Sequence, residues 1–217
     1  NYTHNSLPPL TVTSPIYRYL QQDTTLKEVI LSGGDPLLYD DIALKRLIET
    51  LETLPHIQRL RIHTRLPIVL PARITSTLAN MLSNSRLQPV MVVHCNHPEE
   101  LNRETQACFD TLRSHNITCL NQSVLLKGIN DQSDILIELS EKLFQQGVLP
   151  YYLHTLDPVQ GSAHFNISNE QINQLIQALL IACPGYLVPK LVTEIPGIPY
   201  KTPWKIRQDS FSETGKN

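Results

Sequence analysis

The feature of this sequence that most constrains its fold is a regular alternation of short apolar runs with longer segments of helical periodicity. The apolar runs are rich in branched residues and end at polar ones, which is typical of buried strands. We predict strands over residues 28–32, 58–64, 89–94, 117–122, 149–155 and 187–194. Between them apolar residues recur every three or four positions, and we predict helices over residues 41–54, 75–83, 99–114, 132–146 and 168–182.

This alternation, with short connections, predicts right-handed crossovers and a parallel sheet that is either doubly wound or closed into a barrel. We favour an α/β fold with a partial, TIM-like barrel, because polar residues follow nearly every strand and such ends meet at one mouth of a barrel. Ser14 and Pro15 predict a helix that ends near Gln22, so the pattern opens on a helix. We therefore interpret the barrel as lacking its first strand.

The C-terminal part departs from this alternation. Residues 196–203 contain three prolines and a glycine around Lys201, which predicts a rigid loop without regular structure that crosses the sheet edge. We predict a single domain over residues 1–207 and a flexible tail over residues 208–217.

The composition and charge of the chain argue against nucleic acid and membrane as binding partners. The chain has 217 residues, of which 41% are hydrophobic, and a formal net charge of -2, so it has no basic field for nucleic acid. No stretch is apolar enough to cross a membrane and no signal peptide is present, so we expect a cytoplasmic protein with a small ligand. The spacing of the four cysteines does not suit a metal site, and we expect reduced, buried thiols at Cys95, Cys108, Cys119 and Cys183.

Several predicted strands end in residues that could bind a ligand. The first strand is followed by the segment Ser32-Gly33-Gly34-Asp35-Pro36. This segment either binds the amino and carboxylate groups of an amino acid or forms a simple tight turn. Arg65 and Arg73 follow the second strand and either hold an anion or form salt bridges.

The next two strands also end in polar residues. The third ends in His94-Cys95-Asn96-His97, for which we favour hydrogen bonding to a ligand over metal binding, because no third metal ligand lies nearby. The fourth ends in Asn121-Gln122, whose amides donate to a phosphate or a nucleoside, or complete a turn.

The last strands add charged candidates. Asp157 follows the fifth strand and either binds a substrate ammonium or caps a turn. Glu194 and Lys201 flank the proline-rich loop, and a lysine such as Lys201 is either the amine that forms a Schiff base with an aldehyde cofactor or an ordinary solvated side chain.

Six segments, taken in order, resemble one known family. They are SGGDPL at 32–37, RLRIHTRLPIVLPARIT at 59–75, HCNHPEE at 94–100, LNQSVLLKGIND at 120–131, PYYLHTLDPVQGSAHF at 150–165, and GYLVPK with PYKTP at the end. The chain resembles the lysine 2,3-aminomutases between residues 27 and 203, and most closely the branch that makes β-lysine for elongation factor P.

The resemblance implies a partial radical S-adenosylmethionine (SAM) barrel that moves the amino group of lysine from C2 to C3 with SAM, pyridoxal phosphate (PLP) and a [4Fe–4S] cluster. It implies that Gly33, Gly34 and Asp35 hold SAM and that Asn96 and His97 assist. It also implies that Gln122 contacts PLP and that Lys201 forms the Schiff base with PLP.

Two further positions match substrate-binding acids of the family, namely Asp157 and Glu194. Where Glu194 stands, the free-lysine enzymes carry aspartate, and the extra methylene bears on the length or handedness of the substrate. This difference fits the branch that serves elongation factor P.

The family holds its cluster with a CxxxCxxC segment, and this sequence contains no such spacing. We therefore expect the chain to be the later portion of a longer enzyme or a degenerate copy, and to be inactive without the cluster segment. The alternatives are a remnant that binds PLP or a partner without turnover, and an ordinary PLP or aldolase-type enzyme that uses Lys201 without radicals.

Overall fold

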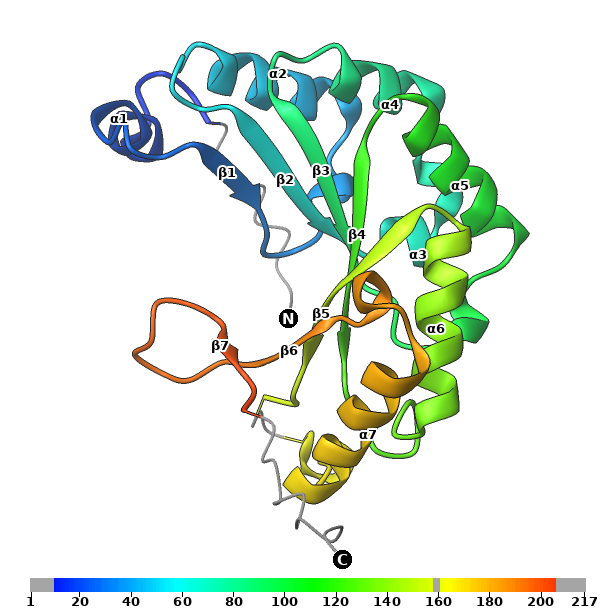
Figure 1. Ribbon diagram of the computed structural model, residues 1–217. Coiled ribbons are helices and arrows are strands. Elements are labelled where there is room, and N and C mark those ends of the chain that lie inside the picture. The colour runs from blue at the N-terminus through cyan, green and yellow to red at the C-terminus, as the bar shows by residue number, and fades with distance from the viewer. Residues whose placement is uncertain (1–9, 158–160, 206–217) are drawn as a thin grey trace, which may run out of the picture.

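The computed structural model describes residues 10–157 and 161–205 as a curled sheet with helices on its outer side (Figure 1). The predicted tail over residues 208–217 lies outside the described residues. Seven strands follow one another across the sheet in chain order, from β1 to β7. Their bounds are β1 Glu28–Leu31, β2 Arg59–Thr64, β3 Gln88–Val93, β4 Thr118–Val124, β5 Val148–His154, β6 Lys190–Thr193 and β7 Thr202–Pro203.

Strands β1 to β6 are parallel and β7 is antiparallel to β6. The α-helices are α1 Pro15–Gln22, α2 Asp41–Glu52, α3 Leu66–Val69, α4 Ser76–Ser83, α5 Arg103–Ser114, α6 Ser133–Gln145 and α7 Asn169–Ala182. Short 3-10 turns lie at Pro36–Leu38, Pro71–Arg73, Pro98–Glu100, Ala163–Phe165 and Gly185–Leu187. The predicted partial barrel is confirmed, and no helix of the described part is long and apolar enough to cross a membrane.

Alternation along the strands decides which side chains face the helices. On β2, Leu60, Ile62 and Thr64 are at most 2% exposed, whereas the residues between them, such as Arg61 and His63, are only partly buried. Leu60 and Ile62 pack against α2, α4 and α5 in one apolar cluster, so the intervening polar residues point to the concave side. A second cluster joins β5 and β6 to α6 and α7.

Three local predictions were wrong. The predicted helix at 99–114 begins only at Arg103, because the side chain of Asn102 accepts hydrogen bonds from the backbone N–H groups of Glu104 and Thr105 and caps α5 there. The predicted strand at 187–194 is shorter, because a 3-10 turn occupies Gly185–Leu187.

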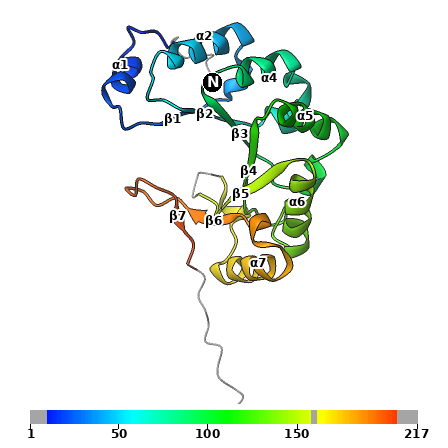
Figure 2. The ribbon, with the colours of Figure 1, turned by 45° about the horizontal axis from the view of Figure 1, so that its top comes forward.

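The third concerns the proline-rich segment, which we predicted to have no regular structure. Thr202 pairs with Thr193, so the segment ends in β7 and closes an antiparallel hairpin with β6. In both views the loop of this hairpin projects toward the side of the picture on which the edge strand β1 lies (Figures 1 and 2).

Candidate active site

Two pockets lie at the C-terminal ends of the strands. The first, which we call the glycine-loop pocket, has a volume of about 400 Å³ and is formed by residues that follow or end β1, β2, β3 and β4. Its lining residues are Ser32, Gly33, Gly34, Asp35, His63, Thr64, Arg65, His94 and Gln122. Positions predicted from two separate motifs, Gly33, Gly34 and Asp35 from one and Gln122 from the other, therefore meet in one place.

The glycine loop, residues 32–36, needs glycine at Gly33 and Gly34 because of their backbone conformation, and not because neighbouring atoms leave no room for a side chain. Gly33 and Gly34 have φ angles of 85° and 60°, a region that side chains other than glycine rarely adopt. A Cβ atom at either residue would meet nothing within 4 Å, so open space lies against this stretch of backbone. A ligand can thus approach the main chain closely.

The carboxylate of Asp35 holds this loop against β2. Its Oδ1 accepts hydrogen bonds from the backbone N–H of Leu37 at 3.0 Å and from the hydroxyl of Thr64 at 2.7 Å, and its Oδ2 accepts from the backbone N–H of Arg65 at 2.7 Å. These contacts make Asp35 a residue that positions the glycine loop. The part in SAM binding predicted for Asp35 stays a prediction.

His94 and Gln122 form a polar pair on the pocket wall. The side-chain amide of Gln122 donates to His94 Nε2, with 2.5 Å between the two nitrogens. Gln122 Oε1 and His63 Nε2 are buried and have no hydrogen-bond partner within the described chain. Because buried polar atoms are nearly always paired, these two atoms mark where a polar ligand would bind.

Burial holds these histidines uncharged at neutral pH. Burial, followed by the charge of Arg61 and then that of Lys201, lowers the pKa of His63 to about 4. Burial, followed by the charges of Arg65 and His63, lowers the pKa of His94 to about 4 as well. The wall therefore presents neutral hydrogen-bonding groups instead of cations.

The same shifts predict how stability depends on pH. Between pH 6.5, the ordinary pKa of histidine, and pH 4, the unfolded chain binds more protons than the folded chain does. We therefore expect the free energy of unfolding to fall as the pH falls through this window, in urea titrations at several pH values. In a double variant, His63→Gln with His94→Gln, the fall should be shallower, and an unchanged slope would contradict this assignment.

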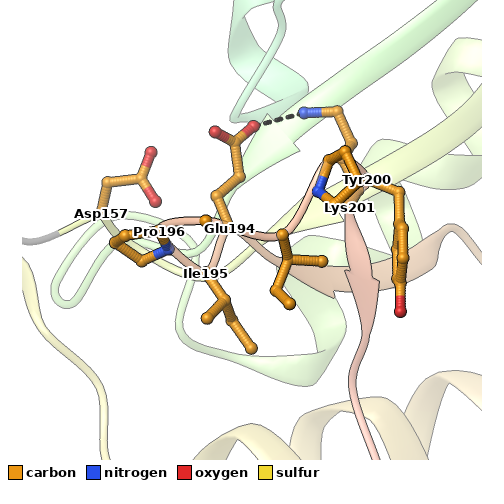
Figure 3. Close-up of a pocket in the computed structure, with 9 residues that line it drawn as sticks. Asp157, Glu194, Ile195, Pro196, Tyr200 and Lys201 are labelled. Carbon is orange, nitrogen blue, oxygen red and sulfur yellow. Dashed lines mark hydrogen bonds and ion pairs between the residues drawn. The ribbon is translucent and has the colours of Figure 1, made fainter.

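The second pocket, which we call the hairpin pocket, lies beside the β6–β7 hairpin and has a volume of about 590 Å³ (Figure 3). It brings together Asp157, Glu194 and Lys201, which were all predicted as site residues. The remaining lining residues are Ile195, Pro196, Gly197, Ile198, Pro199 and Tyr200.

Lys201 and Glu194 form an ion pair in this pocket, with 2.5 Å between Lys201 Nζ and Glu194 Oε1. The hydrogen bond from Lys201, and then its charge, lowers the pKa of Glu194. The Lys201 ammonium also lies 5.8 Å from the centre of the Tyr152 ring, a cation–π distance.

Lys201 links the two pockets electrostatically. Its charge contributes, after burial, to lowering the pKa of His154 at the end of β5, and it is among the groups that lower the pKa of His63. His154 Nε2 is buried without a partner in the described chain. His63 and His154 received no role from sequence reasoning, although their alternation with buried residues along β2 and β5 could have placed them on the concave side.

Asn96 and His97 line neither pocket. Asn96 Oδ1 accepts from the backbone N–H of Val124 at 2.9 Å, and His97 Nδ1 accepts from the backbone N–H of Glu99 at 3.2 Å. Their side chains thus join loops to neighbouring segments, and their part in SAM binding stays a prediction. Arg73 is also structural, because it donates to Leu37 O and pairs with Asp41.

The cysteines are buried free thiols, as predicted. Burial raises the pKa of Cys108 and Cys119 to about 12, and burial also raises that of Cys95 and Cys183. Within residues 10–157 and 161–205, no three histidine, cysteine or acidic side chains are grouped so as to hold a metal ion. The described thiols therefore do not fit an iron–sulfur cluster, which needs several thiolates around one site.

Comparison with solved structures defines the class of fold. A radical SAM methyltransferase from Sphaerobacter thermophilus matches 82% of this chain and 54% of its own at 18% identity, with a TM-score of 0.58. Streptococcus suis SuiB bound to S-adenosylmethionine matches 77% of this chain and 39% of its own at 17% identity, with a TM-score of 0.52. The chain thus has the fold of radical SAM barrel enzymes.

Comparison of sequences then identifies the family. No family model matches the chain. L-lysine 2,3-aminomutase of Haemophilus influenzae is 53% identical over 184 residues, and that of Escherichia coli is 50% identical over 185 residues; each alignment covers 85% of this chain and 54% of the relative. The enzyme of the same name from Clostridium subterminale is 38% identical over 186 residues, which are 85% of this chain and 44% of the relative.

The chain belongs to the lysine 2,3-aminomutase family. It spans about half the length of the curated relatives it matches.

Proposed function

We propose that this chain carries the substrate and cofactor sites of an L-lysine 2,3-aminomutase, an isomerase that moves the amino group of lysine from C2 to C3. The observation that carries this proposal is the meeting of Lys201, Glu194 and Asp157 in the hairpin pocket, on the same concave side as the glycine-loop pocket. The names of the relatives support the same reaction.

Lys201 fits the attachment of PLP. Its amine lies in a pocket of about 590 Å³, and its side chain is 31% exposed, so an aldehyde can reach it. When bound, PLP supplies an aldehyde that links to amines and a ring that delocalises electrons beside the linked nitrogen. The carboxylates of Asp157 and Glu194 would orient the ammonium of lysine in this pocket.

The glycine-loop pocket fits SAM. The backbone at Gly33 and Gly34 is open to an amino acid group, and the partnerless atoms Gln122 Oε1 and His63 Nε2 can hydrogen-bond to further polar groups of the ligand. When bound, SAM supplies the adenosyl group from which the radical chemistry of this fold class starts. We also propose that Gln122 contacts PLP. The hydrogen bond of Gln122 to His94 supports a second role for Gln122, in ligand binding at the glycine-loop pocket.

These residues would act by holding and shielding the reactants. Asp35 fixes the glycine loop, the neutral histidines offer hydrogen bonds without adding charge, and the hairpin loop forms one wall of the pocket that holds Lys201. The described cysteines do not fit the cluster that the fold class implies, so we derive no step that depends on it.

We further propose that the product is β-lysine for elongation factor P and that the protein is cytoplasmic. The higher identity to the relatives from Haemophilus influenzae and Escherichia coli than to that from Clostridium subterminale supports this branch.

A second candidate function is binding of PLP or a partner without turnover, which the poor fit of the described cysteines to a cluster favours.

A chimera separates the two functions. Residues 27–203 would replace the matching segment of the Haemophilus influenzae relative, and conversion of lysine would be followed by mass spectrometry under anaerobic, reducing conditions with SAM and PLP. We expect β-lysine from the chimera and none from its Lys201→Ala variant. A chimera that binds both cofactors and yields no β-lysine would favour the binding function.

A further inference from the structure

Strand β5 contains an extra residue at Tyr151. Two consecutive residues of β4, at positions 121 and 122, pair with Pro150 and Tyr152, so the register between the strands skips Tyr151. Successive side chains of a regular strand point to opposite faces, whereas the ring centres of Tyr151 and Tyr152 lie 3.9 Å apart. Tyr151 therefore forms a β-bulge, a feature that redirects the side chains of a strand.

The bulge decides which side chains of β5 face the concave side of the sheet. Val148 before the bulge and Leu153 after it are both buried in apolar clusters shared with the outer helices. They stand five positions apart, and strict alternation over an odd number of positions would put them on opposite faces. The inserted residue corrects this phase, so Tyr152 and His154, on either side of Leu153, point to the concave side.

Tyr152 reaches Lys201 from this concave side. The centre of its ring lies 5.8 Å from Lys201 Nζ, and the negative face of an aromatic ring attracts a cation at this distance. The His154 ring stands edge-on against the Tyr152 ring, with 5.7 Å between their centres. Ring contacts with Tyr151 and His154 thus hold the Tyr152 ring in its orientation.

Tyr152 and Glu194 hold Lys201 relative to different parts of the fold. Glu194 follows β6 in the same hairpin as Lys201, so their ion pair fixes the lysine within the hairpin. Tyr152 belongs to β5, and β6 lies between β5 and β7 in the sheet (Figure 1). The ring contact therefore fixes Lys201 relative to the sheet.

We propose that Tyr152 is a positioning residue, whose ring, directed by the bulge at Tyr151, holds the Lys201 nitrogen where PLP links to it. When PLP links, a bond forms between this nitrogen and the aldehyde carbon, and the aldehyde oxygen leaves as water with two protons of the ammonium. The third proton stays on the nitrogen, which keeps its positive charge, so the ring attracts it before and after linkage. This inference rests on the proposed function.

Urea unfolding without PLP measures the contact itself. In a double-mutant cycle between Tyr152→Leu and Lys201→Met, we expect a coupling of about two- to fivefold in the unfolding equilibrium constant, the range for a partly exposed cation–π contact. A second cycle, with Tyr186→Leu in place of Tyr152→Leu, should show no coupling. Tyr186 is exposed and lies outside both pockets, so it is a matched control.

Equilibrium titration with PLP, followed by the absorbance of the linked cofactor, measures the effect on attachment. Tyr152→Leu leaves the lysine side chain free to move until PLP links, and we expect attachment about two- to tenfold weaker than in the parent, the usual effect of ordering one long side chain. Tyr152→Phe keeps the ring without its hydroxyl and should match the parent.

The outcomes separate this role from the function on which it rests. Absence of coupling in the first cycle would overturn the positioning role, and so would equal attachment of PLP to the parent and to Tyr152→Leu. A loss in Tyr152→Phe as large as that in Tyr152→Leu would overturn it too, because the hydroxyl would then be the group that acts. Coupling in a parent chain that does not attach PLP would overturn the proposed function and leave the contact between ring and ammonium standing.

Discussion

Replacement of Lys201 by alanine is expected to abolish covalent attachment of PLP to this chain. Lys201 is the lysine that lines the hairpin pocket, and its amine is held there by Glu194 with the Tyr152 ring nearby. The parent, incubated with PLP and reduced with borohydride, should carry a pyridoxyl group on the peptide that contains Lys201. Peptide mass mapping measures this directly.

Lys127→Ala is the matched control for this experiment, because Lys127 is exposed and lies outside both pockets. It should be labelled at Lys201 as strongly as the parent. Equal labelling of the Lys201→Ala variant, on some other lysine, would show that the amine is misassigned and would move the partner-binding function ahead.

Replacement of Asp35 by asparagine is expected to loosen the glycine loop and to weaken SAM binding by about tenfold or more. The amide would offer an N–H₂ group where Asp35 Oδ2 now accepts from the backbone N–H of Arg65, so two donors would face each other. We expect a loss of about 1–3 kcal/mol in the free energy of unfolding, the usual range for an unsatisfied polar group. Urea unfolding and equilibrium dialysis with SAM measure the two effects.

Asp40→Asn provides the same chemical change nearby. The carboxylate of Asp40 caps α2 by accepting one hydrogen bond from the backbone N–H of Ala43, which an asparagine oxygen can also accept. Stability and SAM binding should therefore stay close to those of the parent. If both variants behave alike, the three-way contact of Asp35 is not what holds the loop.

The alternation of strands and helices was readable from the sequence because it depends on local periodicity. The buried side of each helix and the ends of most strands follow from it, and so does the meeting of Gly33, Gly34 and Gln122 at one mouth. The hairpin of β6 and β7 was not predicted, because prolines at three positions disfavour a strand and the short β7 forms only by pairing with β6.

The distinction between binding and structural roles could not be read from the sequence. Asn96 stands in a motif rich in hydrogen-bonding groups, but its side chain accepts from the backbone of Val124 on a neighbouring strand. Conversely, the sequence places His63 within a strand and gives it no distinguishing feature. The structure singles it out, because its buried Nε2 has no hydrogen-bond partner in the described chain. Both outcomes depend on contacts between residues about thirty or more positions apart or on the depth of burial, which no local pattern encodes.

The order of strands in the sheet matches their order in the chain, so each strand of the sheet pairs with the one made just before it. A nascent chain can therefore add strands one at a time, with short loop closures, and need not wait for a distant segment. Among the described elements, the hairpin that carries Glu194 and Lys201 comes after the other strands in the chain, so we expect it to dock after them. PLP would then bind only after the described strands have paired, because the hairpin loop lines the pocket that holds Lys201. A chain that lacks the hairpin would not bind the cofactor.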